Sequence, residues 1–315
     1  LRDTRHYLFM NDCNGHFSEQ AVERGATPVE DKPTVFGMGV TFGDYDKDGY
    51  LDIFVAEWRA SMVRGRPTTW PQGTRQHNRL LRNKGKEAPG FFTDETDRAG
   101  INLEGRSGNP EWEGVFGFAP TFIDLDGDGW LDLAIAADFV SSGIWWNNGD
   151  GTFTDGTKAA GVGTDEAGMG STFGDYDGDG RIDWFVTAIY DECGPACGRT
   201  HAVDGNRLYR YDGNRVFSDH TDRARVRNGA WGWAATFIDY DNDGDLDIAH
   251  TAGFHMVGMP HIDRFREDPT FFQRNDGGVY TEIGEEVGIR DSKEGRGLLS
   301  FDYDNDGDLD LFLVQ

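Results

Sequence analysis

One nonapeptide pattern, Asp-x-Asp-x-Asp-Gly-x-x-Asp, occurs five times in this chain of 315 residues and constrains the fold more than any other feature. The copies occupy residues 44–52, 124–132, 175–183, 239–247 and 302–310. Each copy is followed by a short apolar run of strand length, such as LAIAA after the second copy, without a helical period. A chain that repeats one unit in this way builds an array or ring of similar units, because one unit cannot bury its apolar face alone.

A second segment recurs between the nonapeptides. It consists of an apolar and aromatic run, a turn rich in Asn, Asp and Gly, and a further short run, as in IWWNNGDGTFTD and NRLYRYDGNRVFSD. This composition is typical of a β-hairpin with a tight turn. Each repeat therefore has four expected strands: one on either side of the nonapeptide, and two in the hairpin. Four strands per repeat are typical of a β-propeller blade.

We therefore expect an all-β propeller of five four-stranded blades, forming one domain over residues 1–315. The predicted blades cover residues 37–96, 115–155, 166–221 and 230–283, and a fifth combines residues 295–315 with residues 1–20. The chain opens with the second half of a repeat and closes with the first half. Strands from both ends would complete the last blade and leave no free sheet edge. The alternative is a fragment of a longer ring whose other blades lack the motif.

The nonapeptides are predicted to be metal sites. Calcium takes about six to eight oxygen ligands, mostly carboxylates and carbonyls. Asp at positions 1, 3 and 5 directs alternate side chains to one centre, Gly at position 6 permits the turn, and Asp at position 9 closes the shell. An EF-hand needs Glu at position 12, but here that position holds Val55, Ile135, Val186, His250 and Leu313, so the loops join strands.

We expect about one calcium ion per blade, with the position-7 carbonyl as an additional ligand. The predicted ligands are Asp44, Asp46, Asp48, Tyr50 and Asp52; Asp124, Asp126, Asp128, Trp130 and Asp132; Asp175, Asp177, Asp179, Arg181 and Asp183; Asp239, Asp241, Asp243, Asp245 and Asp247; and Asp302, Asp304, Asp306, Asp308 and Asp310.

These motifs resemble FG-GAP/VCBS repeats. The resemblance is strongest in GWAATFIDYDNDGDLDIAHTAG (Gly232 to Gly253) and extends over nearly the whole chain. Such repeats form the calcium-binding propellers of integrin α-chains, and occur in bacterial secreted proteins and in the cartilage-acidic-protein group. The resemblance implies a propeller that binds calcium. It does not specify an activity, because this fold carries adhesion modules, lectins and enzymes.

The composition of the chain limits the classes of binding partner and the cellular compartment that we expect for it. The formal charge of −26 argues against nucleic-acid binding, and no apolar run is long enough for a membrane-spanning helix. The three cysteines are too few for a disulfide scaffold, although Cys193 and Cys197 could close a small disulfide and leave Cys13 unpaired. Calcium loops fit an oxidising, calcium-rich exterior. We expect a secreted or periplasmic protein, and its start at Leu1 is compatible with a removed leader.

Three predicted insertions follow second strands, at residues 57–77, 191–205 and 253–270, and should emerge on the face opposite the calcium turns. Loops on one face of a rigid scaffold commonly bind ligands. Arg, His and Trp side chains there could hold an anionic or sugar ligand. The alternative is that these loops pack on one another and that the arginines pair with surplus carboxylates. The candidate ligand-face residues are Arg59, Arg64, Arg66, Trp70, His201, His255 and His261.

The sequence favours a non-enzymatic binding or adhesion module for a glycan or protein partner at this face. The alternative is an extracellular hydrolase or lyase that acts on a polysaccharide, with two carboxylates as acid and base. Candidates for that chemistry are Glu57, Asp138, Asp191, Glu192 and His255. A third possibility is a subunit of a larger assembly, held through Cys13 or the loops.

Overall fold

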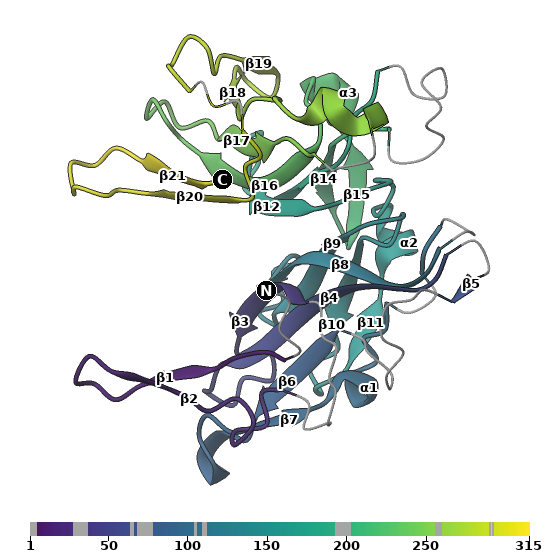
Figure 1. Ribbon diagram of the computed structural model, residues 1–315, viewed down its shortest axis with the longest axis vertical. Coiled ribbons are helices and arrows are strands. Elements are labelled where there is room, and N and C mark those ends of the chain that lie inside the picture. Colours follow the sequence, from purple (N-terminus) through teal and green to yellow (C-terminus); the bar gives the residue numbers. More distant parts are fainter. Residues whose placement is uncertain are drawn as a thin grey trace. The chain divides into compact units, whose positions relative to one another are not determined.

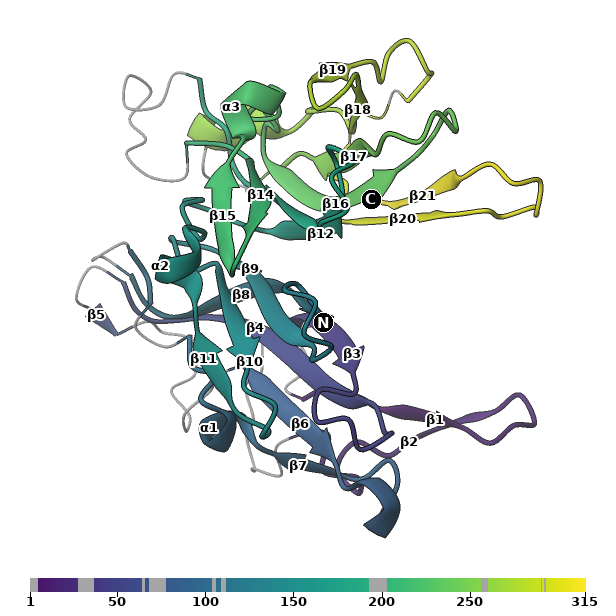
Figure 2. The same cartoon turned by 180° about the vertical axis from the view of Figure 1, so that it is seen from behind.

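The structure is a computed structural model that describes residues 5–27, 37–63, 66–67, 78–103, 106–108, 112–192, 203–255, 260–289, 291 and 293–315. The chain divides into two compact units. The first unit comprises residues 1–135 and 143–156, and the second comprises residues 136–142 and 157–315. Figure 1 labels most strands of both units, and Figure 2 shows the molecule from behind.

The first unit contains two successive repeats whose strands join in one sheet. The order of the sheet is β11-β10-β9-β8-β4-β6-β7, with β3 and β5 also paired to β4. Its strands are β3 (Gly37–Gly43), β4 (Asp52–Val63), β5 (Arg66–Pro67), β6 (Arg79–Asn83), β7 (Phe92–Asp94), β8 (Trp112–Ile123), β9 (Asp132–Ala137), β10 (Gly143–Asn147) and β11 (Phe153–Asp155). A separate two-stranded hairpin precedes them, formed by β1 (Phe9–Asn11) and β2 (Phe17–Glu19).

The second unit contains two four-stranded antiparallel sheets and a terminal hairpin. One sheet comprises β12 (Gly170–Gly174), β13 (Asp183–Thr187), β14 (Arg207–Gly213) and β15 (Val216–Asp219). The other comprises β16 (Gly232–Ile238), β17 (Asp247–Ala252), β18 (Phe271–Asn275) and β19 (Tyr280–Glu282). The hairpin is formed by β20 (Gly297–Phe301) and β21 (Asp310–Val314). Within each sheet, neighbours in sequence are neighbours in space.

In the second, third and fourth repeats, the second strand lies at the centre of the core. All residues of β9, β13 and β17 are buried, as expected for apolar runs covered on both faces. In the second unit, Phe185 and Leu208 of one sheet pack in one cluster with Ile248 and Tyr280 of the next. Full burial of a side chain such as Phe185 stabilises the fold by about 1.5–3 kcal/mol. The repeats therefore share a core instead of each burying its own.

Three one-turn helices, which the sequence analysis did not predict, follow the outer strands: α1 (Thr96–Ala99), α2 (Thr157–Ala160) and α3 (Thr221–Ala224). The first Thr of α1 and α3 ties the helix to its sheet. Thr96 Oγ1 accepts the Leu80 N–H at 2.8 Å, and Thr221 Oγ1 accepts the Leu208 N–H at 3.0 Å. The described chain also forms the 3₁₀ helices η1 (Gly85–Glu87) and η3 (Pro260–Phe265).

The start of the predicted 57–77 insertion is a strand rather than a loop. β4 continues to Val63 and pairs with the first half of β8, with Trp58 opposite Phe116. The Trp58 and Trp112 rings lie 6.2 Å apart in an edge-on arrangement, and Trp58 packs on Phe116 at 5.5 Å. Cross-strand aromatic pairs of this kind favour extended pairing over a loop. This extension joins the first two repeats into one sheet.

The all-β expectation is confirmed, whereas the closed five-blade ring stays a prediction. The hairpins β1-β2 and β20-β21 are two-stranded sheets. In the described part of the chain, no helix has the length and apolar character needed to cross a bilayer.

Candidate metal loops and a polar pocket

The five Asp-rich loops share one hydrogen-bond pattern. In every loop the Gly at position 6 donates its N–H to the position-1 carboxylate, at 2.7–3.1 Å. The position-7 N–H bonds to the position-5 carboxylate at 2.8–3.0 Å. Position 6 requires glycine because its φ is positive, for example 88° at Gly49 and 92° at Gly244. These bonds hold the turn and leave other carboxylate oxygens for a ligand.

The position-9 Asp joins the loop to its sheet. One of its oxygens accepts the position-2 N–H at 2.9–3.2 Å in all five loops. In the first four loops the other oxygen accepts an N–H from the third strand, at 2.7–2.9 Å. These four Asp side chains are buried, whereas Asp310 of the fifth loop is exposed. Position 9 therefore orients the loop in addition to any role in metal binding.

The loops bring together oxygen atoms in a way that suits a hard cation. In each loop, three carboxylates place one oxygen each within 4.8 Å of the others. In three loops that set combines positions 1, 3 and 9; the first and fifth loops combine positions 1, 3 and 5. Asp46 Oδ1 is buried and has no hydrogen-bond partner among the described residues. A bound cation would satisfy this oxygen, so the residues present fit calcium.

The electrostatics of position 9 also favour a cation. Burial raises the pKa of Asp52, Asp132 and Asp183 to about 7, and that of Asp247 to about 6. The carboxylates at positions 3 and 5 raise these pKa values further, while the two backbone N–H bonds lower them. A divalent ion would supply the missing opposite charge.

Two loops hold a cationic side chain that the sequence analysis missed. Arg82 of β6 contacts Asp46, and its Nη2 lies 3.0 Å from Asp48 Oδ2. Arg210 of β14 lies 2.5 Å from Asp177 Oδ2 and also contacts Asp179. The signal was present in the sequence, because RLLRN and RLYRY place Arg at the same position of the third strand. In the fourth repeat, Arg274 bonds instead to Asp276 in its own hairpin, at 3.1 Å.

Few of the predicted ligand-face side chains can be placed. Arg64, Trp70, His201, Cys193 and Cys197 lie outside the described residues, as do the side chains of Arg66 and His261. Arg59 lies in β4 and is only 9 % exposed, so it is not an open surface group. His255 Nδ1 lies 3.1 Å from Asp263 Oδ1 within the β17–β18 connection. Cys13 is free and exposed.

A pocket of about 400 Å³ lies in the second unit, where connections that follow two second strands meet. It is lined by residues 190–192 after β13, by Asn228 and Ala230 before β16, and by Arg264, Phe265 and Asp268 between β17 and β18. In each antiparallel sheet the second strand starts at the Asp loop, so this pocket lies beyond the other end of β13 and β17. The sequence analysis expected the insertions 191–205 and 253–270 on one face, but did not predict which of their residues line a pocket.

The pocket contains an ion pair between an exposed arginine and a buried carboxylate, and a second carboxylate. Arg264 contacts Asp191, whose side chain is 3 % exposed. Burial raises the pKa of Asp268 to about 6, although a backbone hydrogen bond from Trp231 and the Arg264 charge oppose the shift. Phe265 is buried and lies 5.3 Å from the Trp231 ring.

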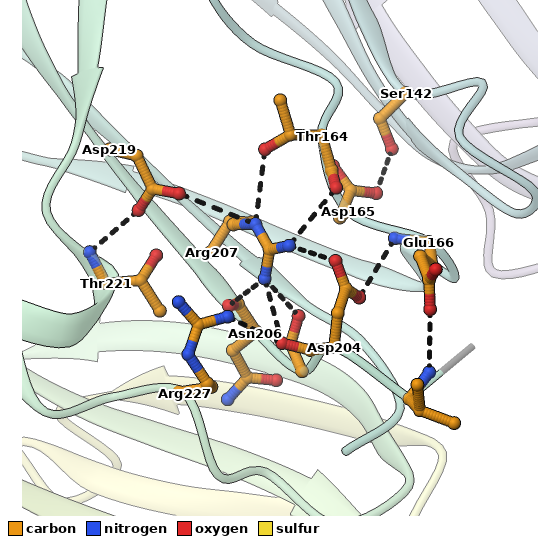
Figure 3. A network of polar contacts seen from close by, with 12 residues as sticks. Ser142, Thr164, Asp165, Glu166, Asp204, Asn206, Arg207, Asp219, Thr221 and Arg227 are labelled. Carbon is orange, nitrogen blue, oxygen red and sulfur yellow. Dashed lines mark hydrogen bonds and ion pairs between the residues drawn. The ribbon is translucent and has the colours of Figure 1, made fainter. Parts of the chain in front are cut away.

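One side of this pocket is anchored by Arg207, at the centre of the network in Figure 3. Its Nη1 donates to the carbonyls of residues 204, 205 and 206 at 3.0 Å, and its Nε donates to Thr164 Oγ1 at 3.2 Å. Asp204 in turn pairs with Tyr190 in a β-bridge. Asp165 completes the network: it accepts a bond from Ser142 Oγ at 2.6 Å, and burial raises its pKa. Through the bridge between Asp204 and Tyr190, the network holds the backbone of residues 190 and 191 in position.

Comparison with known proteins supports the repeat assignment. The FG-GAP-like repeat family matches residues 124–186 and 197–250. No curated protein sequence matches the chain. Among solved structures, the chain is similar to the biofilm matrix protein Bap1 of V. cholerae, with 16% sequence identity and a TM-score of 0.40. That similarity covers 89% of this chain but only 35% of the Bap1 chain. The chain thus contains FG-GAP-like repeats over residues 124–186 and 197–250.

Proposed function

We propose that this chain is a secreted or periplasmic, calcium-stabilised binding module. It holds a glycan or protein partner at the end of the repeats opposite the Asp loops, and serves an adhesion-type role. The observation that carries this proposal is the pocket beyond β13 and β17, which combines an ion pair, a second carboxylate and an aromatic wall. Polar groups that converge beside an aromatic ring fix the orientation of a ligand in small-molecule sites.

Calcium is the proposed cofactor, with about one ion per Asp loop. The side chains at positions 1, 3, 5 and 9 and the position-7 carbonyl would hold it, and the ion would neutralise the carboxylates at each turn. Loops with dissociation constants of about 10⁻⁴–10⁻³ M fill in extracellular calcium. At about 1 mM calcium, each such loop stabilises the native state by about 0.4–1.4 kcal/mol.

Melting of the protein with and without chelator tests the calcium proposal. We expect the melting temperature to fall after exhaustive chelation and to recover with millimolar calcium, because the ion binds only the native state. Asp241→Ala should lower the calcium stoichiometry by one and shrink the shift. Asp276→Asn, in an exposed hairpin turn of the same repeat, is the control. An unchanged melt, or full stoichiometry in Asp241→Ala, contradicts the ligand assignment.

The binding role is tested by retention of the calcium-loaded protein on a panel of immobilised polysaccharides and extracellular matrix proteins. Retention of at least one panel member without turnover is the expected result. Failure to retain any of them contradicts the binding role. Cleavage of a polysaccharide would instead favour the extracellular hydrolase or lyase.

A further inference from the structure

We propose that the pocket between the β13, β16 and β17 connections takes a sugar residue that carries a free, protonated amine, such as a hexosamine unit of a deacetylated polysaccharide. This inference rests on the proposed binding function and names the ligand class for its pocket. It is carried by charge, by one carboxylate oxygen and by the shape of the lining.

The charges that line the pocket leave an excess of negative charge. Among the lining residues that the structure describes, Asp191, Glu192 and Asp268 face one cation, Arg264, and Arg264 is already in contact with Asp191. The guanidinium also lies over the ring of its neighbour Phe265, with 4.9 Å between its carbon atom and the ring centroid. An anionic ligand would have to displace the Asp191 contact and approach two further carboxylates. A cationic group meets complementary charge instead.

Asp268 supplies a specific acceptor for that cation. Its carboxylate accepts the backbone N–H of Trp231. Its Oδ2 is buried and has no hydrogen-bond partner among the described residues. A buried carboxylate oxygen without a partner is costly, and a charged donor satisfies it best. An ammonium group fits this position because it offers three donors and a full charge.

The remaining lining suits a ring with hydroxyl groups. The volume of about 400 Å³ falls in the range of about 300–1,000 Å³ for small-molecule sites. Tyr190 is half-buried and provides an aromatic ring for the apolar face of a sugar, and Phe265 supports Arg264 from below. Asn228 Oδ1 accepts the Ala230 N–H at 3.2 Å, which orients its amide at the rim of the pocket. A lone lysine side chain would contact the ammonium acceptor but leave much of this wide pocket unfilled.

Calorimetric titration of the calcium-loaded protein with D-glucosamine, glucose and N-acetylglucosamine tests the inference. At about pH 7, where an aliphatic amine is largely protonated, we expect glucosamine to bind about tenfold or more tightly than either neutral sugar. Equal affinity for all three sugars would overturn the amine assignment but leave the binding function intact. A lysine amide that binds as tightly as glucosamine would overturn the sugar assignment.

Variants locate the site. Asp268→Asn keeps the shape and removes the charge, so it should reduce glucosamine affinity about tenfold and leave glucose affinity unchanged. Asp276→Asn is the matched control, because Asp276 is an exposed carboxylate of the same unit outside the pocket. Melting curves report whether each variant folds, and Glu192→Gln replaces Asp268→Asn if the latter does not. Undiminished glucosamine binding in a folded pocket variant overturns the assignment. So does a lack of glucosamine binding by a protein that is retained on the panel.

Discussion

Glu57 is the clearest example of a single residue whose pKa is set by its surroundings in the fold. Its side chain is fully buried, and burial raises its pKa to about 7, although Arg79 and Arg59 oppose the shift. Arg79 Nε lies 3.4 Å from Glu57 Oε1, and His6 Nε2 lies 3.8 Å from the same oxygen. The sequence analysis named Glu57 as a candidate for acid–base chemistry, and could not foresee its burial.

The raised pKa of Glu57 predicts a pH-dependent contribution to stability. The folded pKa of about 7 exceeds the usual Glu value of 4.5, so the native state holds the proton more tightly. The stability that this provides is present below about pH 4.5 and is lost as pH rises through about 7. The free energy of unfolding of Glu57→Gln, measured relative to that of the wild type, should therefore be higher at about pH 8 than at about pH 5. The expected increase is up to about 3 kcal/mol.

Urea denaturation of Glu57→Gln and the wild type across this pH range measures the effect. Glu23→Gln alters an exposed Glu and serves as the control. A stability difference between wild type and Glu57→Gln that does not change with pH would show that Glu57 titrates normally in the native state.

At the scale of elements, the positions of strands and Asp loops were largely predictable from the sequence. The short helices and the full length of β4 were not. The Asp nonapeptides and the hairpin turns encode the strands on either side of them through local turn chemistry. The one-turn helices after β7, β11 and β15 were missed because four residues carry no periodic pattern. The extension of β4 to Val63 depends on Trp112 and Phe116 of a later strand, so local sequence could not reveal it.

The arginine contacts predict that the Asp loops differ in calcium affinity. In the third loop, Arg210 already holds Asp177 and Asp179, and calcium must compete with that positive charge. Arg210→Gln should therefore raise the affinity of this loop, by roughly three- to tenfold, because the competing cation is removed. Calcium titration by calorimetry measures this change.

Arg274→Gln provides the matched control. Arg274 occupies the equivalent strand position of the next repeat but bonds to its hairpin residue Asp276. Its removal should leave calcium affinity unchanged. Weaker calcium binding in Arg210→Gln would mean that Arg210 supports the loop instead of competing with the ion.

At the scale of the whole molecule, the terminal hairpins bear on the proposed ring. Each carries large exposed apolar side chains, including Phe9 and Phe17 in the first and Leu299 and Phe312 in the last.

The other repeats indicate the register of such a closure. In four repeats the position-9 Asp accepts an N–H from a third-strand residue: Asn83, Asn147, Tyr211 and Asn275. The matching position in the first hairpin is Asn11, and the matching Asp is Asp310. If the proposed closure forms, this register places Phe9 opposite Leu311.

A cysteine pair tests that register. In a Cys13→Ser background, Phe9→Cys with Leu311→Cys should form a disulfide within one chain under mild oxidation, because opposed strand residues have adjacent Cβ atoms. Mass spectrometry and non-reducing electrophoresis detect it. Met10→Cys with Leu311→Cys is the control, because its side chain points to the other face of the strand. An absent bridge in the first pair, or equal bridging in both pairs, contradicts the predicted closure.

The sequence by itself determined the repeat, the all-β class and the acidic loops, because turn geometry and strand length depend on residues within about ten positions of each other. Only the tertiary structure decided that Asp191, Asn228 and Asp268 line one pocket, that Arg210 reaches an Asp loop, and that Glu57 is buried. Those properties depend on contacts between residues far apart in the chain. Burial and charge pairing at such contacts are set by packing, which local sequence patterns do not encode.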